Sequence, residues 1–247
     1  MPIRCCKSRL LIDQFDFSLS TQGATIEGDT GSIEYNTFQQ CATLRMPNLP
    51  SIMVNQNGYF DGSANGTLDK EVNNRLGDTG SHYVSIVIGT DQPIPVVYTL
   101  DEVFAQQFQT QGQTKELISI KANWVSRGSV DGCGFRGYLV QYGTISATGA
   151  ITGIDFSAAG SLGGKAFLHV ISITGTATNA AIKIQSDSVS NFAGAADEGT
   201  FTFSAVGAYE IDLSGTIGRY VRANCSSLGG ATSFLVAIVV CVKGRTY

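Results

Sequence analysis

The sequence predicts an all-β fold that contains one short helix. Of the 247 residues, 43% are apolar, only 15% are charged and 29 are glycine, which suits strands and tight turns better than disorder. Short runs in which every second residue is apolar recur along the chain, separated by glycine-containing turns. Only Leu68–Leu76 has apolar residues at helical spacing. The length is enough for one large β domain or two smaller ones.

The first predicted strands are short and are separated by turn residues. Arg9–Ser18 alternates roughly, and Ala24–Glu27 and Gly31–Phe38 follow as short strands. The stretch Gln39–Pro50 contains two prolines and has no clean period, so it is predicted to be a long loop.

The next segment, Ser51–Phe60, is apolar and is a candidate hairpin. The dipeptide Asn57-Gly58 lies between its apolar runs and predicts a two-residue turn. Three further strand-like runs follow the helix, namely Tyr83–Gly89, Pro95–Gln109 and Glu116–Trp124.

The helix is predicted from residues that recur at four-residue spacing. Leu68, Val72 and Leu76 would share one face. Thr67 is placed to cap the start of this helix and Gly77 to end it.

Glycine-rich segments predict a division into two domains. Ser126–Gly134 and Ala158–Gly164 are candidate connectors, and all five prolines lie at or before Pro95. Residues 1–144 hold 14 acidic and 10 basic side chains, whereas residues 145–247 hold 6 of each. We predict a first β domain over 1–140 and a second over 141–247.

The second domain is predicted to be an immunoglobulin-like or jelly-roll β-sandwich, because strand candidates alternate with glycine turns about every ten residues. The candidates are Ala166–Thr174, Ala180–Gln185, Gly199–Val206, Tyr209–Leu213, Arg219–Cys225 and Thr232–Lys243. The last contains Phe234–Val242, an apolar run that predicts a buried strand.

The titratable residues do not form a pattern typical of catalysis. His169 lies in the apolar run Phe167–Ile171, which favours a hydrogen-bonded structural histidine, and His82 lies in a turn. A serine triad requires a serine on a sharp turn and a histidine oriented by a carboxylate, and the motif for such a turn is missing. Metal sites need clustered ligands. We therefore expect no enzyme activity, no metal and no cofactor.

Six cysteines are expected to be free thiols, because the chain opens without the apolar segment of a secretory signal. Cys225 and Cys241 lie in apolar strand patterns and are expected in the core. The adjacent pair Cys5-Cys6 lacks the spacing of a zinc site.

Charge and hydropathy also restrict the partners. The net charge of −4 does not favour binding to nucleic acid. A membrane-spanning helix needs about 20 apolar residues, which is longer than Phe234–Val242. We expect no membrane partner.

The order of elements in the first domain resembles the tail tube proteins of long-tailed bacteriophages. The resemblance covers about residues 9–128 and depends on the succession of elements rather than on a motif: Ser32–Tyr35, the irregular loop to Pro50, the strand Ile52–Phe60, the helix Leu68–Leu76, the strand Val84–Gly89, Val96–Leu100 passing into Val103–Phe108, and Thr114–Trp124. It implies a small β-barrel or sandwich with one helix that forms stacked hexameric rings. The second domain then resembles the extra sandwich modules on the outer surface of some tail tube and capsid proteins.

This resemblance implies a virion structural protein of the phage tail that assembles in the host cytoplasm. Its partners would be copies of itself and other tail proteins, and DNA would pass through the lumen without specific binding. Contacts with the next ring are implied for the loop Thr37–Pro50 and the arm Met1–Leu10. The candidate assembly residues are Ile3, Arg4, Thr37, Phe38, Gln39, Arg45 and Met46.

Other functions remain open at the level of sequence. The extra hundred residues beyond a minimal tube subunit are compatible with a capsid decoration (cement) protein or with another virion ring protein. A carbohydrate-binding adhesion module is a further alternative, for which Tyr209 and Tyr220 are candidate binding aromatics.

Overall fold

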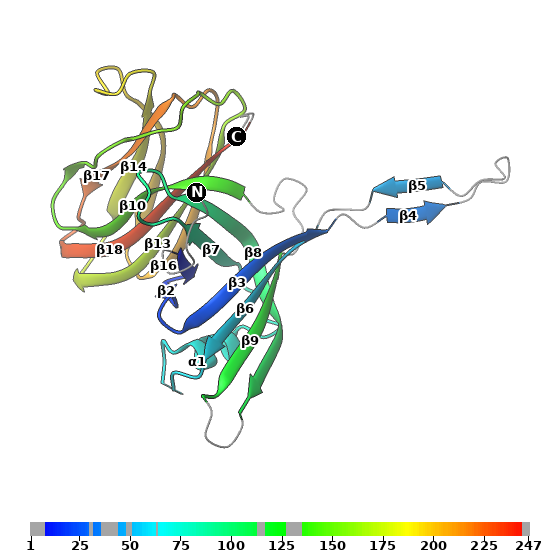
Figure 1. Cartoon of the computed structure of the whole chain (residues 1–247). Coiled ribbons are helices and arrows are strands. Elements are labelled where there is room, and N and C mark those ends of the chain that lie inside the picture. Colours follow the sequence, from blue (N-terminus) through cyan, green and yellow to red (C-terminus); the bar gives the residue numbers. More distant parts are fainter. Residues whose placement is uncertain are drawn as a thin grey trace. The chain divides into compact units, whose positions relative to one another are not determined.

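The structure is a computed structural model, and it describes residues 8–29, 32–35, 44–47, 51–62, 64–112, 117–126 and 135–243. Strands dominate these residues, and α1 (Leu68–Asn74) is their one α-helix. The predicted all-β class with one short helix is confirmed (Figure 1). Within the described residues, no helix is long and apolar enough to span a membrane.

The chain forms two compact units, and one of them is discontinuous in sequence. Unit 1 comprises residues 1–16, 85–98 and 136–247, and unit 2 comprises residues 17–84 and 99–135. Three strands have residues in both units, namely β7 (His82–Ile88), β8 (Val96–Gln111) and, through its first residue, β10 (Phe135–Ile145). These boundaries differ from the predicted division near residue 140, because two early segments are grouped with the C-terminal residues.

Unit 1 is a β-sandwich. One of its sheets contains the consecutive neighbours β16-β13-β18-β10, and the other has the order β11-β17-β14-β15 with β12 also paired to β17. Its strands outside β7 and β8 are β1 (Ser8–Ile12), β2 (Phe15–Asp16), β10 (Phe135–Ile145), β11 (Gly149–Ala150), β12 (Ile154–Asp155), β13 (Gly164–Gly175), β14 (Ala180–Asp187), β15 (Ala196–Phe203), β16 (Gly207–Leu213), β17 (Tyr220–Ser227) and β18 (Ala231–Val242).

The core of unit 1 is formed by alternate residues of the facing sheets. Leu168 and Val170 of β13 belong to one buried cluster with Ile182 and Ile184 of β14. The apolar strand β18 pairs with both β13 and β10, and its residues Phe234 to Val242 are almost all buried. All six strands predicted between residues 166 and 243 are present, and the prediction that Cys225 and Cys241 are buried is confirmed.

Unit 2 contains a four-stranded antiparallel sheet in the order β3-β6-β9-β8. Its other strands are β3 (Thr21–Asp29), β6 (Ser51–Tyr59) and β9 (Ser119–Ser126). A separate two-stranded ribbon pairs β4 (Ser32–Tyr35) with β5 (Leu44–Pro47) (Figure 1). The predicted loop Gln39–Pro50 therefore contains a strand, because the proline at position 47 is the last residue of β5 and interrupts no pairing inside it.

The predicted turn at Asn57-Gly58 is wrong, since both residues lie inside the continuous strand β6. Glycine is required at position 58 for a different reason. A Cβ atom at position 58 would lie 2.5 Å from the Ser20 carbonyl oxygen and 2.7 Å from Leu68 Cδ2. Glycine is needed here because the backbone of the preceding turn and a helix side chain approach the strand closely.

The helix α1 is capped differently from the prediction. Thr67 occupies the N-cap position, but its hydroxyl donates to the carbonyl oxygens of Gly62 and Ala64 and makes no cap bond. The Leu68 N–H instead donates to both carboxylate oxygens of Asp61, at 2.9 and 3.1 Å. The helix ends at Asn74, before the predicted Gly77.

The strand β10 spans the predicted domain boundary at residue 140, in a stretch for which no strand was predicted. Its register with β18 runs from Tyr138↔Val240 to Ile145↔Phe234. A Cβ atom at Gly137 would lie 2.5 Å from both Cys241 Sγ and the Val240 carbonyl oxygen. This glycine is therefore part of a crowded strand pair.

Candidate assembly surface

The sheet of unit 2 has one covered face, and burial alternates along its strands accordingly. In β6, Val54, Gln56 and Gly58 are buried, and in β9 Ile120 and Trp124 are buried. Leu68 and Val72 of α1 are fully buried and form the layer over this face, with Leu68 reaching Gly58. This burial explains why the sheet and the helix form together.

Hydrogen bonds fix the polar groups inside this face. Trp124 Nε1 donates to Gln56 Oε1 at 3.0 Å, and Gln56 Nε2 donates to Thr21 Oγ1 at 3.0 Å. The chain of bonds joins three neighbouring strands through the buried Trp124 and Gln56 and the half-buried Thr21. It therefore holds β3, β6 and β9 in one register.

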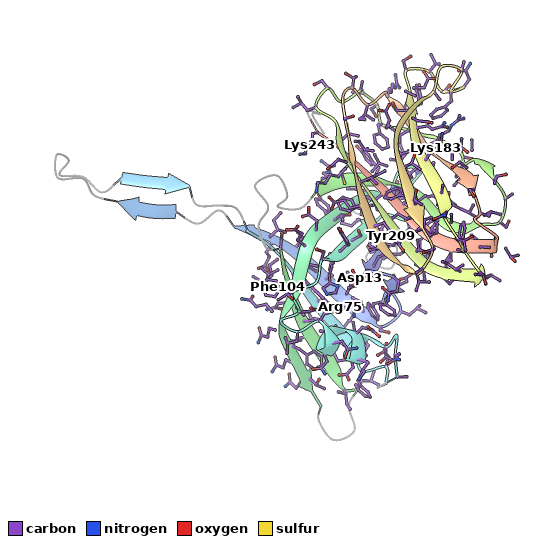
Figure 2. The ribbon with its side chains drawn as sticks, turned by 180° about the vertical axis from the view of Figure 1, so that it is seen from behind. Asp13, Arg75, Phe104, Lys183, Tyr209 and Lys243 are labelled. Carbon is purple, nitrogen blue, oxygen red and sulfur yellow. The ribbon has the colours of Figure 1, made fainter. Side chains whose placement is uncertain are left out.

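The end of α1 is attached to β8. Arg75 Nη1 donates to Glu71 Oε2 at 2.6 Å, with both side chains about nine-tenths buried. The backbone of Ala105 in β8 makes two hydrogen bonds to this end of the helix. Its N–H donates to the Arg75 carbonyl oxygen, and its carbonyl oxygen accepts from the Gly77 N–H. Figure 2 labels Arg75 at this helix and Phe104 next to the attachment point on β8.

The opposite face, which we call the bare face, consists of the alternate positions that are not buried. The register places Thr25, Asn55, Asn123 and Gln107 side by side across the four strands. Asn123 Nδ2 donates to Gln107 Oε1 at 3.0 Å within this row. These side chains were not singled out from the sequence, although the alternation of amides in Asn55/Asn57 and in Gln107/Gln109/Gln111 is a period-two signal.

The sheet of unit 2 also has two open edges. Among the described strands, β3 pairs with β6 alone; its nine residues contain neither proline nor lysine, and its two charged residues, Glu27 and Asp29, lie in its last three positions. The second open edge is the end of β8, which continues past Ala105 to Gln111. Of the strands that the structure describes, the register pairs this end with β9. The segment Gln106–Gln111 is uncharged and mostly exposed. Long edges without such protection are typical of strands that pair with another chain.

The structure describes two of the seven predicted assembly residues. Arg45 and Met46 lie in β5, where their backbone positions are opposite Glu34 and Ile33 of β4. Ile3, Arg4, Thr37, Phe38 and Gln39 lie outside the described residues, as do Cys5 and Cys6. The assignment of all seven residues to ring contacts stays a prediction.

The one buried histidine–serine pair of the described residues is in unit 1. His169 is fully buried, and its Nε2 lies 2.8 Å from Ser85 Oγ while its Nδ1 lies 2.6 Å from the Asp13 carbonyl oxygen. A carbonyl oxygen can only accept, so Nδ1 carries the proton and Nε2 accepts from the serine hydroxyl. Burial lowers the pKa of His169, although its bond to the Asp13 carbonyl and the Asp13 charge oppose this shift. With no carboxylate bonded to the ring and no solvent access to it, the pair is a structural bond, as predicted.

No group of three or more His, Cys, Asp or Glu side chains able to hold a metal is found in the described part of the chain. Burial raises the pKa of the Cys225 thiol, which disfavours its reactive thiolate form.

Comparison with known proteins gave structural similarities only. No family model matches the sequence, and no curated protein matches it. The tail of an empty gene transfer agent particle is 13% identical, with a TM-score of 0.34 over 49% of this chain and 92% of that chain. The sheath/tube terminator of an extracellular contractile injection system is 12% identical, with a TM-score of 0.39 over 51% and 93%.

One similar structure extends over both units. The Dit protein of the phage SPP1, described as a hub of the adsorption apparatus in phages infecting Gram-positive bacteria, is 11% identical, with a TM-score of 0.31 over 94% of this chain and 98% of that chain. All three TM-scores are below 0.5, so neither the fold assignment nor the proposed function depends on these similarities.

Proposed function

We propose that this chain is a structural subunit of a phage tail whose copies join through the open edges of unit 2 into closed rings. The observation that carries the proposal is the four-stranded sheet with two open edges, β3 and the end of β8. The resemblance of the sequence over about residues 9–128 to tail tube proteins supplies the class of particle. The ring would be hexameric if the resemblance extends to symmetry.

The direction of the strands supports edge-to-edge joining. All three pairings in the order β3-β6-β9-β8 are antiparallel, so the two edge strands run in opposite directions. The β8 edge of one copy can therefore pair with β3 of the next and continue the antiparallel alternation. Such an interface uses two different surfaces, and repeating it closes a ring when the rotation between copies permits.

In this proposal the rings stack into a tube that conducts DNA. The loop Thr37–Pro50 and the arm Met1–Leu10 contact the next ring, other tail proteins bind the ends of the stack, and the sandwich of unit 1 lies on the outside. The subunit has no catalytic role and acts in the virion after assembly in the host cytoplasm. A ring that does not stack would instead be another virion ring protein.

Electron microscopy of the purified protein over a range of concentrations tests this proposal. Rings or tubes with a central hole are the expected result. Monomers or trimers that bind only to capsids would show a decoration protein, and monomers that bind glycans would show an adhesion module; either result would overturn the proposal.

A charged variant tests the edge itself. Thr110 is exposed near the end of β8, so Thr110→Lys should prevent pairing with a neighbouring β3 and abolish rings while the subunit stays folded. The matched control is Thr216→Lys, at an exposed position outside the strands of unit 1, which should assemble normally. If T110K still forms rings, the β8 edge is not the interface.

Deletion of residues 37–50 tests the stacking contact. The expected product is single rings without tubes, because the deletion removes a predicted ring-to-ring contact and leaves β3, β6, β8 and β9 in place. Long tubes from the deletion variant would show that this loop has another role.

A further inference from the structure

The bare face of unit 2 is unusually rich in neutral amide side chains for an exposed sheet face. Two neighbouring rows of its register carry them. One consists of Thr25, Asn55, Asn123 and Gln107, and the next places Asn57, Lys121 and Gln109 side by side. A third row ends the sheet with Tyr59, Ser119 and Gln111.

The charges on this face are few, and the acidic positions outnumber the basic one. Among its register-paired positions, Glu27 and Asp29 are acidic and Lys121 is basic, which leaves one negative charge in excess. Strong binding to duplex DNA comes from several lysines or arginines that neutralise phosphates and release counterions. A single lysine outnumbered by two acidic residues cannot supply this favourable contribution to DNA binding, while amides exchange hydrogen bonds readily with water.

Closure of a ring through the sheet edges determines which face lies inside. A closed sheet has one inner and one outer face, and the outer face has the larger circumference. The face under α1 carries an additional layer, formed by Leu68, Val72 and the buried Glu71–Arg75 pair. In a closed ring, only the outer side of the sheet has room for this layer. The bare face would therefore lie on the inner side and line the channel.

We infer that the bare face forms a near-neutral, amide-lined channel wall whose passing cargo is double-stranded DNA, held by no array of cations. This inference rests on the proposed function. It assigns the surface in contact with DNA and the chemistry by which that contact stays weak. DNA then moves along the wall through exchange of water-mediated hydrogen bonds and does not have to break ion pairs.

The test converts the wall into a cationic one. Asn55→Lys, Asn123→Lys and Gln107→Lys together add three lysines on three neighbouring strands of each subunit. The control variant adds the same charge at exposed positions of unit 1, through Thr200→Lys, Thr202→Lys and Ser226→Lys. Each protein is assembled in the presence of a short fluorescent DNA duplex, and binding is measured by anisotropy over a series of salt concentrations.

The wild-type assembly should bind the duplex weakly, and the wall variant should bind it at least about tenfold more tightly with a steeper salt dependence. Nuclease then distinguishes inside from outside. DNA bound by the wall variant should be protected from digestion, whereas DNA bound by the control variant should be digested.

The outcomes separate the inference from the proposed function. If wild-type protein forms no rings in the microscope, the proposed function fails and the inference fails with it. If rings form but the DNA held by the wall variant is digested as fast as that held by the control, only the inference is overturned. Should the triple variant not assemble, Asn123→Lys alone is measured with the same two readouts.

Discussion

The imidazole of His169 is held in its neutral form by full burial and by two fixed partners, Ser85 and Asp13. Since its pKa is lowered below 6.5 in the folded protein, the unfolded chain binds more protons once the pH falls through that value. The stability from this site is therefore complete above about pH 6.5 and is lost as the pH falls, by at most about 1.4 kcal/mol per pH unit.

We expect the free energy of unfolding, measured by chemical denaturation, to decrease between pH 7 and pH 5.5, roughly the range in which free histidine titrates. His169→Gln should remove this slope at the cost of lower stability. His82→Gln, which alters the partly exposed histidine beside Asp78, is the control and should retain the slope. An unchanged slope in H169Q would show that another group carries the pH dependence.

A second prediction at the scale of one residue concerns Gly58. Gly58→Ala should lower the free energy of unfolding by about 1–3 kcal/mol, because the added methyl group would overlap the Ser20 carbonyl and the Leu68 side chain. Gly23→Ala is the matched control in the neighbouring strand, where no atom lies within 4 Å of the new Cβ. Equal stability of both variants in denaturant titration would contradict the close approach.

At the scale of elements, α1 depends on a side chain outside its own sequence. Asp61 accepts the first helical N–H, from Leu68, and also the hydroxyl of Ser20 at 2.6 Å. Asp61→Ala should lower the stability by about 1 kcal/mol, the usual cost of losing a cap. Asp69→Asn, also at the start of the helix but with no role in this cap, should change the stability much less. Thermal unfolding of the two variants under identical conditions provides the comparison.

Strand positions were predictable from the sequence wherever apolar residues alternate. Gly58 was interpreted as a turn residue, and no strand was predicted around Gly137, yet both glycines lie inside strands where a Cβ atom would meet another backbone at 2.5 Å. A single sequence shows that a glycine is present but not which distant segment approaches it.

For the candidate assembly surface, the positions of the strands could be predicted from the sequence, but their order in the sheet could not. Alternation in β6 and β9 shows which side chains share a face, but the pairing of β3 with β6 depends on contacts across some 30 residues. The open edges and the rows of amides follow from that order and could not be predicted before it was known. The same limit applies to Asp61, whose capping role depends on the path of the loop before α1.

At the scale of the molecule, the discontinuity of unit 1 bears on the predicted division at residue 140. The fragment 1–140 contains β1 and β7, which belong wholly or partly to unit 1, but lacks β13 and β18. Leu11, Ile12 and Val87 are fully buried in the whole chain and would be exposed. We expect this fragment to aggregate when expressed alone and to become soluble when co-expressed with residues 141–247.

Size-exclusion chromatography with circular dichroism provides the measurement for both samples. A monodisperse fragment 1–140 with cooperative unfolding would support the domain boundaries predicted from the sequence.

The bond between His169 and the carbonyl of Asp13 joins residues 156 positions apart. Ribosomes add about 5–20 residues per second, so on the nascent chain Asp13 waits on the order of ten seconds for this partner to be made. During that interval the apolar residues next to Asp13, Leu11 and Ile12, have been synthesised without the strand that carries His169. Translation speed and chaperone occupancy are therefore expected to affect the yield of this protein more than that of a chain whose units are each continuous in sequence.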